Sequence, residues 1–178
     1  MTTASGDARQ AAGAALRQLV GDHLECDPMV VDVGNRCRLC GSAEHGKPFV
    51  VGHPDLAVSS STAGHLTLVA LTTAGALGVD IEEVAATDFE GFDDVALEPS
   101  ECAHLDGLTA QPLLHARARL WTRKEAILKA TGHGLAIDPR SVQVTGPDEP
   151  PALAAWTAAT PAPSPVRAPS DRPTVRAR

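Results

Sequence analysis

The sequence predicts a protein that combines α-helices with antiparallel β-strands, the α+β class. Two long stretches, residues 8–24 and 113–131, carry apolar side chains at helical spacing and predict amphipathic helices. Between them, residues 66–71 are apolar and β-branched and residues 77–84 alternate, with a turn-like stretch in the middle. This pattern predicts a hairpin of two antiparallel strands. The chain is long enough for one domain, or for two small lobes that share one core.

Shorter elements are expected in the rest of the chain. A glycine, Gly132, follows the second long helix and is a stop signal. Short strands are expected at residues 29–33 and 141–145, and a further helix is expected to begin near Pro99. Residues 157–178 are rich in proline, alanine and arginine with almost no large apolar side chain, which predicts a disordered tail.

Composition and charge exclude several classes of protein. Hydrophobic residues make up 43% of the 178 residues and charged residues 21%, as in soluble globular proteins. No apolar run approaches the ~20 residues of a membrane span, and the first ten residues do not resemble a secretory signal. We therefore expect a cytoplasmic protein without a membrane partner. The net charge of -7 argues against nonspecific binding to nucleic acid.

Three carboxylates are candidates for a metal site. On an extended strand, Asp80 and Glu82 would point to one face, and Glu125 shares the face of the second long helix that carries Trp121. Carboxylate oxygens are the ligands that Mg²⁺ prefers, usually together with substrate phosphates. The alternative for Glu125 is an exposed ion pair with Lys129, four residues further along the helix. The other acidic residues between 80 and 106 are expected to form a solvated acidic loop.

Several short motifs occur in an order that resembles a known family. Gly78-Val79-Asp80-Ile81-Glu82 is followed by Trp121-Thr122-Arg123-Lys124-Glu125-Ala126-Ile127-Leu128-Lys129 and then by Ala130-Thr131-Gly132-His133-Gly134-Leu135. Upstream lies His45-Gly46-Lys47-Pro48. Together these motifs, over about residues 9–144, resemble the signature of 4′-phosphopantetheinyl transferases of the Sfp type.

The resemblance implies a fold and an activity. The fold would be two pseudo-symmetric α/β lobes with small antiparallel sheets, at about residues 1–75 and 76–156, with an incomplete second lobe. The activity would be that of a holo-[acyl-carrier-protein] synthase. It transfers 4′-phosphopantetheine from coenzyme A to a serine of an acyl or peptidyl carrier protein with Mg²⁺ and releases adenosine 3′,5′-bisphosphate. We expect a monomer.

The same resemblance implies a role for each matched residue. Asp80, Glu82 and Glu125 would hold Mg²⁺, and Glu125 and Lys129 would be catalytic. Coenzyme A would be bound by residues spread over the whole chain: Arg9, Lys47, Pro48, Ser60, Ser61, Lys124 and Lys129. Serine at position 60 or 61 departs from the family, which commonly has a histidine there, and His65 is a candidate substitute. Two alternatives follow: a non-catalytic degenerate paralogue that binds coenzyme A or carrier protein, or an unrelated metal-binding module.

The cysteines offer a second candidate metal site. Cys37 and Cys40 are separated by two residues, and His45 follows closely, which is the local spacing of half a zinc site. Cys26 or His53 could add a ligand. A second Cys-x-x-Cys pair is absent from the sequence, so a loop of reduced thiols is the alternative.

Overall fold

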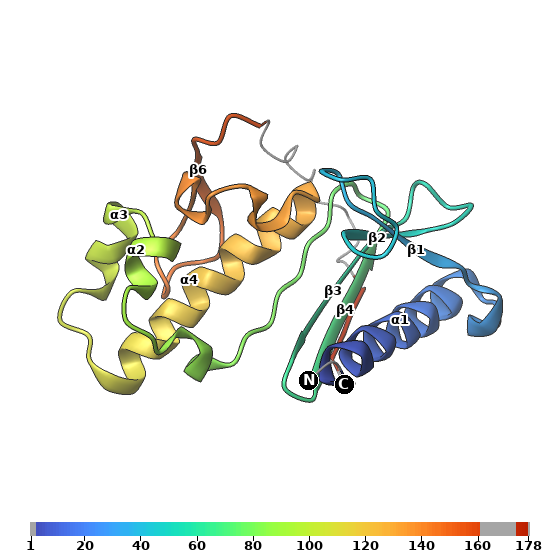
Figure 1. Cartoon of the computed structure of the whole chain (residues 1–178), viewed down its shortest axis with the longest axis horizontal. Helices are drawn as coiled ribbons and strands as arrows, with labels where there is room; N and C mark the ends of the chain where they lie inside the picture. Colours follow the sequence, from blue (N-terminus) through green and yellow to red (C-terminus); the bar gives the residue numbers. More distant parts are fainter. Residues whose placement is uncertain (1–2, 161–173, 178) are drawn as a thin grey trace.

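The computed structural model describes residues 3–160 and 174–177, which form two parts that lie side by side (Figure 1). The first part is a long helix, α1 (Thr3–Leu24), on an antiparallel sheet of five strands in the order β1-β2-β3-β4-β7. The strands are β1 (Val33–Arg36), β2 (Lys47–Val50), β3 (Ala57–Ala63), β4 (Leu66–Thr72) and β7 (Thr174–Ala177). A 3₁₀ turn, η1 (Pro28–Val30), links α1 to the sheet.

The core of the first part lies between α1 and the strands β3 and β4. Leu16, Leu19 and Val20 follow helical spacing and are at most 2% exposed. They pack with buried side chains of the sheet, including Val58 and Leu71. This packing explains why the periodic stretch at the start of the chain forms a helix.

The second part is built around α4 (Ala110–Thr131) (Figure 1). Two short helices, α2 (Phe92–Ala96) and α3 (Pro99–Cys102), and a two-stranded antiparallel sheet of β5 (Val142–Val144) and β6 (Leu153–Trp156) accompany it. Gly132 ends α4 with a left-handed backbone, which glycine adopts without steric cost. The remaining 3₁₀ turns of this part are η2 (Val84–Thr87), η3 (Ala103–Leu105), η4 (Gly134–Ala136) and η5 (Pro139–Ser141).

An extended segment, residues 73–83, crosses from β4 to the second part (Figure 1). It is held against both parts. The Val79 amide donates to Ser59 Oγ of β3 over 3.1 Å. The Gly78 backbone lies so close to α4 that a Cβ at this position would meet the Ala126 carbonyl and lie 2.5 Å from the Ala130 nitrogen.

The α+β class and the two long helices are confirmed, but the predicted hairpin is wrong. The apolar run 66–71 lies in β4, which pairs with β3 on one side and with β7 on the other. Residues 77–83 form no strand; their alternation reflects an extended segment wedged between the two parts. The strand expected at 29–33 is also corrected, because the Asp27 carboxylate caps the Met29 amide and the chain turns before β1 begins.

The end of the chain also differs from the expectation. Residues 174–177 pair with β4 as β7, so this part of the tail predicted to be disordered extends the first sheet and covers the β4 edge. Of the rest of that stretch, residues 157–160 are described, with Ala158 packed against the core and Trp156 Nε1 donating to the Thr160 carbonyl over 2.6 Å, whereas residues 161–173 and 178 lie outside the described residues. In the part of the chain that the structure describes, no helix is long and apolar enough to span a membrane.

Candidate active site

A cavity of about 560 Å³ lies where α1, the loop before β2, strand β3 and the last turns of α4 meet. It is lined by most of the residues that the sequence motifs singled out: Arg9, Lys47, Pro48, Ser60, Ser61, Glu125 and Lys129. Residues far apart in the sequence are therefore gathered in one place.

Asp80, on the crossing segment, is bonded to two residues that line this cavity, Ser61 and Lys129. Its side chain is 6% exposed, and its Oδ1 accepts from Lys129 Nζ over 2.5 Å and from Ser61 Oγ over 2.8 Å. Lys129 Nζ also donates to Ser61 Oγ over 2.8 Å. Lys129 therefore pairs with Asp80 of the crossing segment, and not with Glu125 in the exposed helix pair that was the alternative from the sequence.

Two buried carboxylate oxygens find no hydrogen-bond partner among the residues that the structure describes: Asp80 Oδ2 and Glu125 Oε1. An unsatisfied buried oxygen is costly, and a carboxylate more so, unless a cation or a donor meets it. Burial raises the pKa of Glu125, and the charges of Asp80 and Glu82 raise it further, while Lys129 opposes them. The donor set and the two orphaned oxygens fit a hard divalent cation such as Mg²⁺.

Glu82 is the more loosely placed of the three carboxylates. It is half-buried and its Oε1 accepts the Glu83 amide over 2.9 Å. Within the residues that the structure describes, Asp80, Glu82 and Glu125 do not bring three carboxylate oxygens within 4.8 Å of one another. The ammonium of Lys129 is the cation that lies against Asp80 in this arrangement.

Lys47 lines the cavity, but its ammonium is bonded to the backbone. Nζ donates to the Leu77 carbonyl over 3.0 Å and to the Ala130 carbonyl over 2.5 Å, near the C-terminal end of α4. Burial, with a smaller contribution from the charge of Arg38, lowers the pKa of Lys47 to about 8. Lys47 therefore joins the crossing segment and α4 to β2 beside the cavity.

Lys124, which was expected to bind coenzyme A, does not line the cavity. Its side chain is 0% exposed, and Nζ pairs with Glu101 Oε2 over 2.5 Å and donates to the Pro139 carbonyl over 3.0 Å. The sequence carried a signal for this: four residues before and after Lys124 are Leu120 and Leu128, both 0% exposed. Lys124 belongs to that buried row, while Glu125 and Lys129 share the next one.

The remaining candidates divide between the cavity and the surface. Ser60 and Arg9 line the 560 Å³ cavity and also a neighbouring cavity of about 350 Å³ along α1. Ser61 is bonded to Asp80 and Lys129, as described above. His65 is exposed in the turn between β3 and β4 and does not line the cavity, so it does not take the place of the missing histidine.

Several cavity residues have no role assigned from the sequence, among them His133 and Asn35. His133 lines the cavity just after α4, and its Nδ1 is buried without a partner. Asn35, on β1, also lines it. His133 could have been found, since it stands inside one of the quoted motifs. Asn35 carries no signal in the sequence, because only the pairing of β1 with β2 brings it to the cavity.

The structure is an α+β protein whose cavity is lined by a carboxylate, two lysines and an arginine: Glu125, Lys47, Lys129 and Arg9. The comparisons agree with this class. A sequence profile of the 4′-phosphopantetheinyl transferase superfamily matches residues 76–170, and the chain belongs to this superfamily. A protein of Synechocystis sp. named "Putative 4'-phosphopantetheinyl transferase slr0495" is 30% identical over 127 residues. The match covers 68% of this chain and 48% of that relative, so the chain spans about half the relative's length.

Proposed function

We propose that the chain acts as a 4′-phosphopantetheinyl transferase of the Sfp type. It would move 4′-phosphopantetheine from coenzyme A to a serine of an acyl or peptidyl carrier protein, with Mg²⁺. Two observations carry the proposal: Glu125, whose Oε1 is buried and unpartnered, lines the cavity, and Asp80, whose Oδ2 is also buried and unpartnered, forms an ion pair with the cavity residue Lys129. A cation at these oxygens would meet the diphosphate of coenzyme A there.

The reaction balances without a further reactant. The serine oxygen forms a bond to the phosphorus next to pantetheine, and the bond from that phosphorus to the bridging oxygen breaks. Adenosine 3′,5′-bisphosphate leaves, and the serine proton is released. When bound, Mg²⁺ supplies charge neutralisation at the diphosphate.

Each residue of this chain would then have a defined task. Glu125 would accept the serine proton, because its carboxylate lines the cavity beside Lys129. Lys129 would turn its ammonium from Asp80 to the departing phosphate. Arg9 would face the nucleotide, because it lines the cavity from α1. Lys47 would hold the loop and Pro48 against the nucleotide.

The proposal is tested by incubating the full chain with coenzyme A, Mg²⁺ and an apo carrier protein, and weighing the carrier. We expect the carrier to gain the mass of one phosphopantetheinyl group. No gain with fatty-acid, polyketide and nonribosomal-peptide carriers would contradict the proposal. If calorimetry showed binding of coenzyme A while the carrier gained no mass, the result would instead support the non-catalytic paralogue.

Two variants test the assigned carboxylates. Glu125→Gln and Asp80→Asn keep the size of the side chain and remove its charge, so we expect transfer to fall by about 100-fold or more. Glu90→Gln is the matched control, because Glu90 is an exposed acid outside the cavity. Transfer rates equal to the control in both variants would contradict the assignment. Circular dichroism checks that the variants remain folded.

A further inference from the structure

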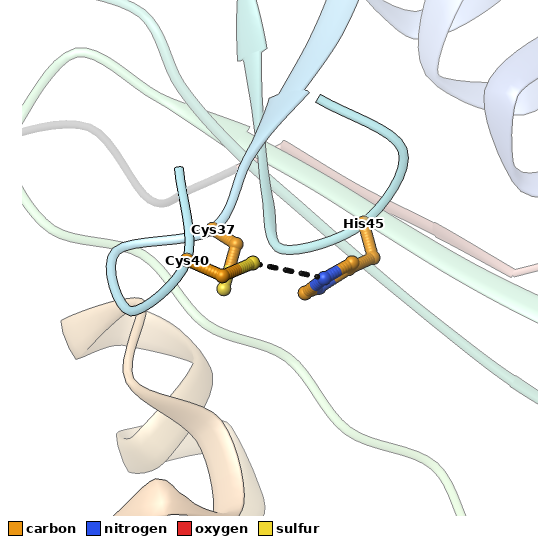
Figure 2. Close-up of side chains that lie close together, drawn as sticks. All are labelled: Cys37, Cys40 and His45. Atoms are coloured by element: carbon orange, nitrogen blue, oxygen red, sulfur yellow. Dashed lines mark hydrogen bonds between the residues drawn. The ribbon is translucent and has the colours of Figure 1, made fainter. Parts of the chain in front are cut away.

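A cluster of two cysteines and a histidine lies in the loop between β1 and β2. The side chains of Cys37, Cys40 and His45 point toward one another (Figure 2). One ligand atom from each lies within 4.8 Å of the other two. Cys40 Sγ is 3.3 Å from His45 Nε2. Around a tetrahedral zinc ion, sulfur and nitrogen ligands lie about 3.6–3.8 Å apart, so only small side-chain movements separate this cluster from a metal site.

The backbone around Cys37 forms a tight turn. The Cys37 amide donates to the Ser42 carbonyl over 2.9 Å, and the Gly41 amide donates back to the Cys37 carbonyl over 3.0 Å. Gly41 has a φ of 73°, a left-handed conformation that glycine adopts readily. The chain thus folds back on itself directly after Cys40, which brings both sulfurs to one side of the turn.

The same turn directs backbone amides at Cys37. The amides of Cys40 and Leu39 hydrogen-bond to the Cys37 sulfur. Thiolate is the form of cysteine that binds metal, and amide hydrogen bonds to the sulfur are the outer contacts that hold such ligands in place. Cys37 is also buried, whereas Cys40 and His45 are exposed.

We propose that Cys37, Cys40 and His45 bind a zinc ion with two thiolates and one imidazole, and that water or an added ligand completes the tetrahedron. Sulfur and imidazole donors select zinc over the hard Mg²⁺ that carboxylates prefer. The two extra ligands considered from the sequence lie elsewhere. Cys26 packs against the core of the first part, and His53 lines a different cavity, beyond β2.

The zinc would fix the loop that enters the candidate active site. Cys37 and His45 line the 560 Å³ cavity together with Lys47 and Pro48. Arg36 pairs with Lys47 at the end of the hairpin, and a Cβ on Gly46 would lie 2.5 Å from the Cys37 nitrogen, so the two ends of the loop are closely packed. A metal at the cluster would join the start of the loop to its end. This role for the loop rests on the proposed function, whereas zinc binding itself does not.

The test measures metal on the full chain. After purification without chelator, elemental analysis is expected to find about one zinc per chain. Stripping the metal and adding Co²⁺ should give the visible bands of tetrahedral cobalt and a thiolate charge-transfer band. Zinc near zero after reconstitution, or a Cys37–Cys40 disulfide in protein kept under reducing conditions, would overturn the proposal.

Matched variants locate the metal. Cys40→Ser and His45→Gln change exposed side chains, and we expect zinc affinity to fall by at least about 10–100-fold. Cys26→Ser and Cys102→Ser are the controls and should keep the zinc, as should Glu125→Gln. If Cys40→Ser and His45→Gln both retained zinc, the assignment would be overturned. This holds even if the variants fold differently from the wild type, because their metal content is measured directly. A chain that transfers phosphopantetheine but holds no zinc overturns this inference alone, and a zinc-bound chain without transfer contradicts only the proposed function.

Discussion

Lys129 of α4 and Asp80 of the crossing segment form an ion pair, with Nζ 2.5 Å from Oδ1. Asp80 is nearly buried and Lys129 is 29% exposed, so the ammonium reaches from the cavity to an interior carboxylate. The pair joins the two sequence motifs at residues 78–82 and 121–129. It therefore offers a direct test of the active-site assignment.

Replacing Lys129 with methionine should remove the cation proposed for the leaving group. We expect kcat for transfer to fall by about 100-fold or more. Lys129→Arg, which replaces the compact ammonium with a forked guanidinium of the same charge, should retain more activity. Arg140→Met, which removes an exposed cation paired with Asp138, is the control. Steady-state kinetics on folded variants measure the effect, and wild-type rates in Lys129→Met would refute the role.

Lys124 and Glu101 form a buried ion pair, with exposed fractions of 0% and 2%. Lys124→Met would leave the Glu101 carboxylate uncompensated, and we expect a loss of about 3–5 kcal/mol in the free energy of unfolding. Arg119→Met breaks the exposed pair with Asp148 and should cost at most about 1 kcal/mol. Urea denaturation compares the two variants. Equal losses would contradict the buried placement of Lys124.

Gly78 is predicted to tolerate no side chain. In Gly78→Ala the new Cβ would meet backbone atoms of Ala126 and Ala130, which cannot swing away as a side chain could. We expect a loss of at least about 1–3 kcal/mol in unfolding free energy, together with lower transfer because Asp80 is displaced. Gly6→Ala, in α1 with nothing within 4 Å of the added Cβ, should instead be neutral or stabilising by up to about 1 kcal/mol. Thermal or urea unfolding would detect a reversed order.

The cap of α3 should make stability depend on pH. Hydrogen bonds from the Ser100 hydroxyl and amide lower the pKa of Glu98 from its ordinary value of 4.5. A lowered pKa in the folded state means that this contribution is present above pH 4.5 and is lost as the pH falls through the folded-state value. Glu98→Gln should therefore destabilise the protein at pH 7 and progressively less below pH 4.5. Glu90→Gln is the control, and a pH-independent difference in urea midpoints would argue against the cap.

Much of this architecture could be predicted where a local pattern decides it. The helix α1 follows from the spacing of Leu16, Leu19 and Val20, and most of the cavity residues follow from the order of the motifs. Strand β3 could not be predicted in the same way. Its centre is Ser59-Ser60-Ser61-Thr62, small polar residues that resemble a loop until the pairing with β4 is known. The sequence pattern therefore pairs the apolar run 66–71 with residues 77–84 instead of with β3.

The roles of the lysines show the same limit. Lys124 and Lys129 both lie close to Glu125 in the sequence. The only local sign that Lys124 is the buried lysine is that Leu120 and Leu128 share its row on the helix. The partner of Lys124, Glu101, lies on another helix, α3, so this ion pair depends on tertiary packing that no local pattern encodes. Lys47 likewise reaches carbonyls of two distant segments.

The crossing segment has a consequence for motion. Lys47 holds the Leu77 carbonyl, Gly78 lies against the backbone of α4, and the Val79 amide is bonded to Ser59. A connection fixed at three successive residues lacks the freedom in φ and ψ that a hinge between domains requires. The two parts are therefore expected to tumble and vibrate as one body, and a ligand would enter the cavity through rearrangement of its rim rather than by the parts swinging open.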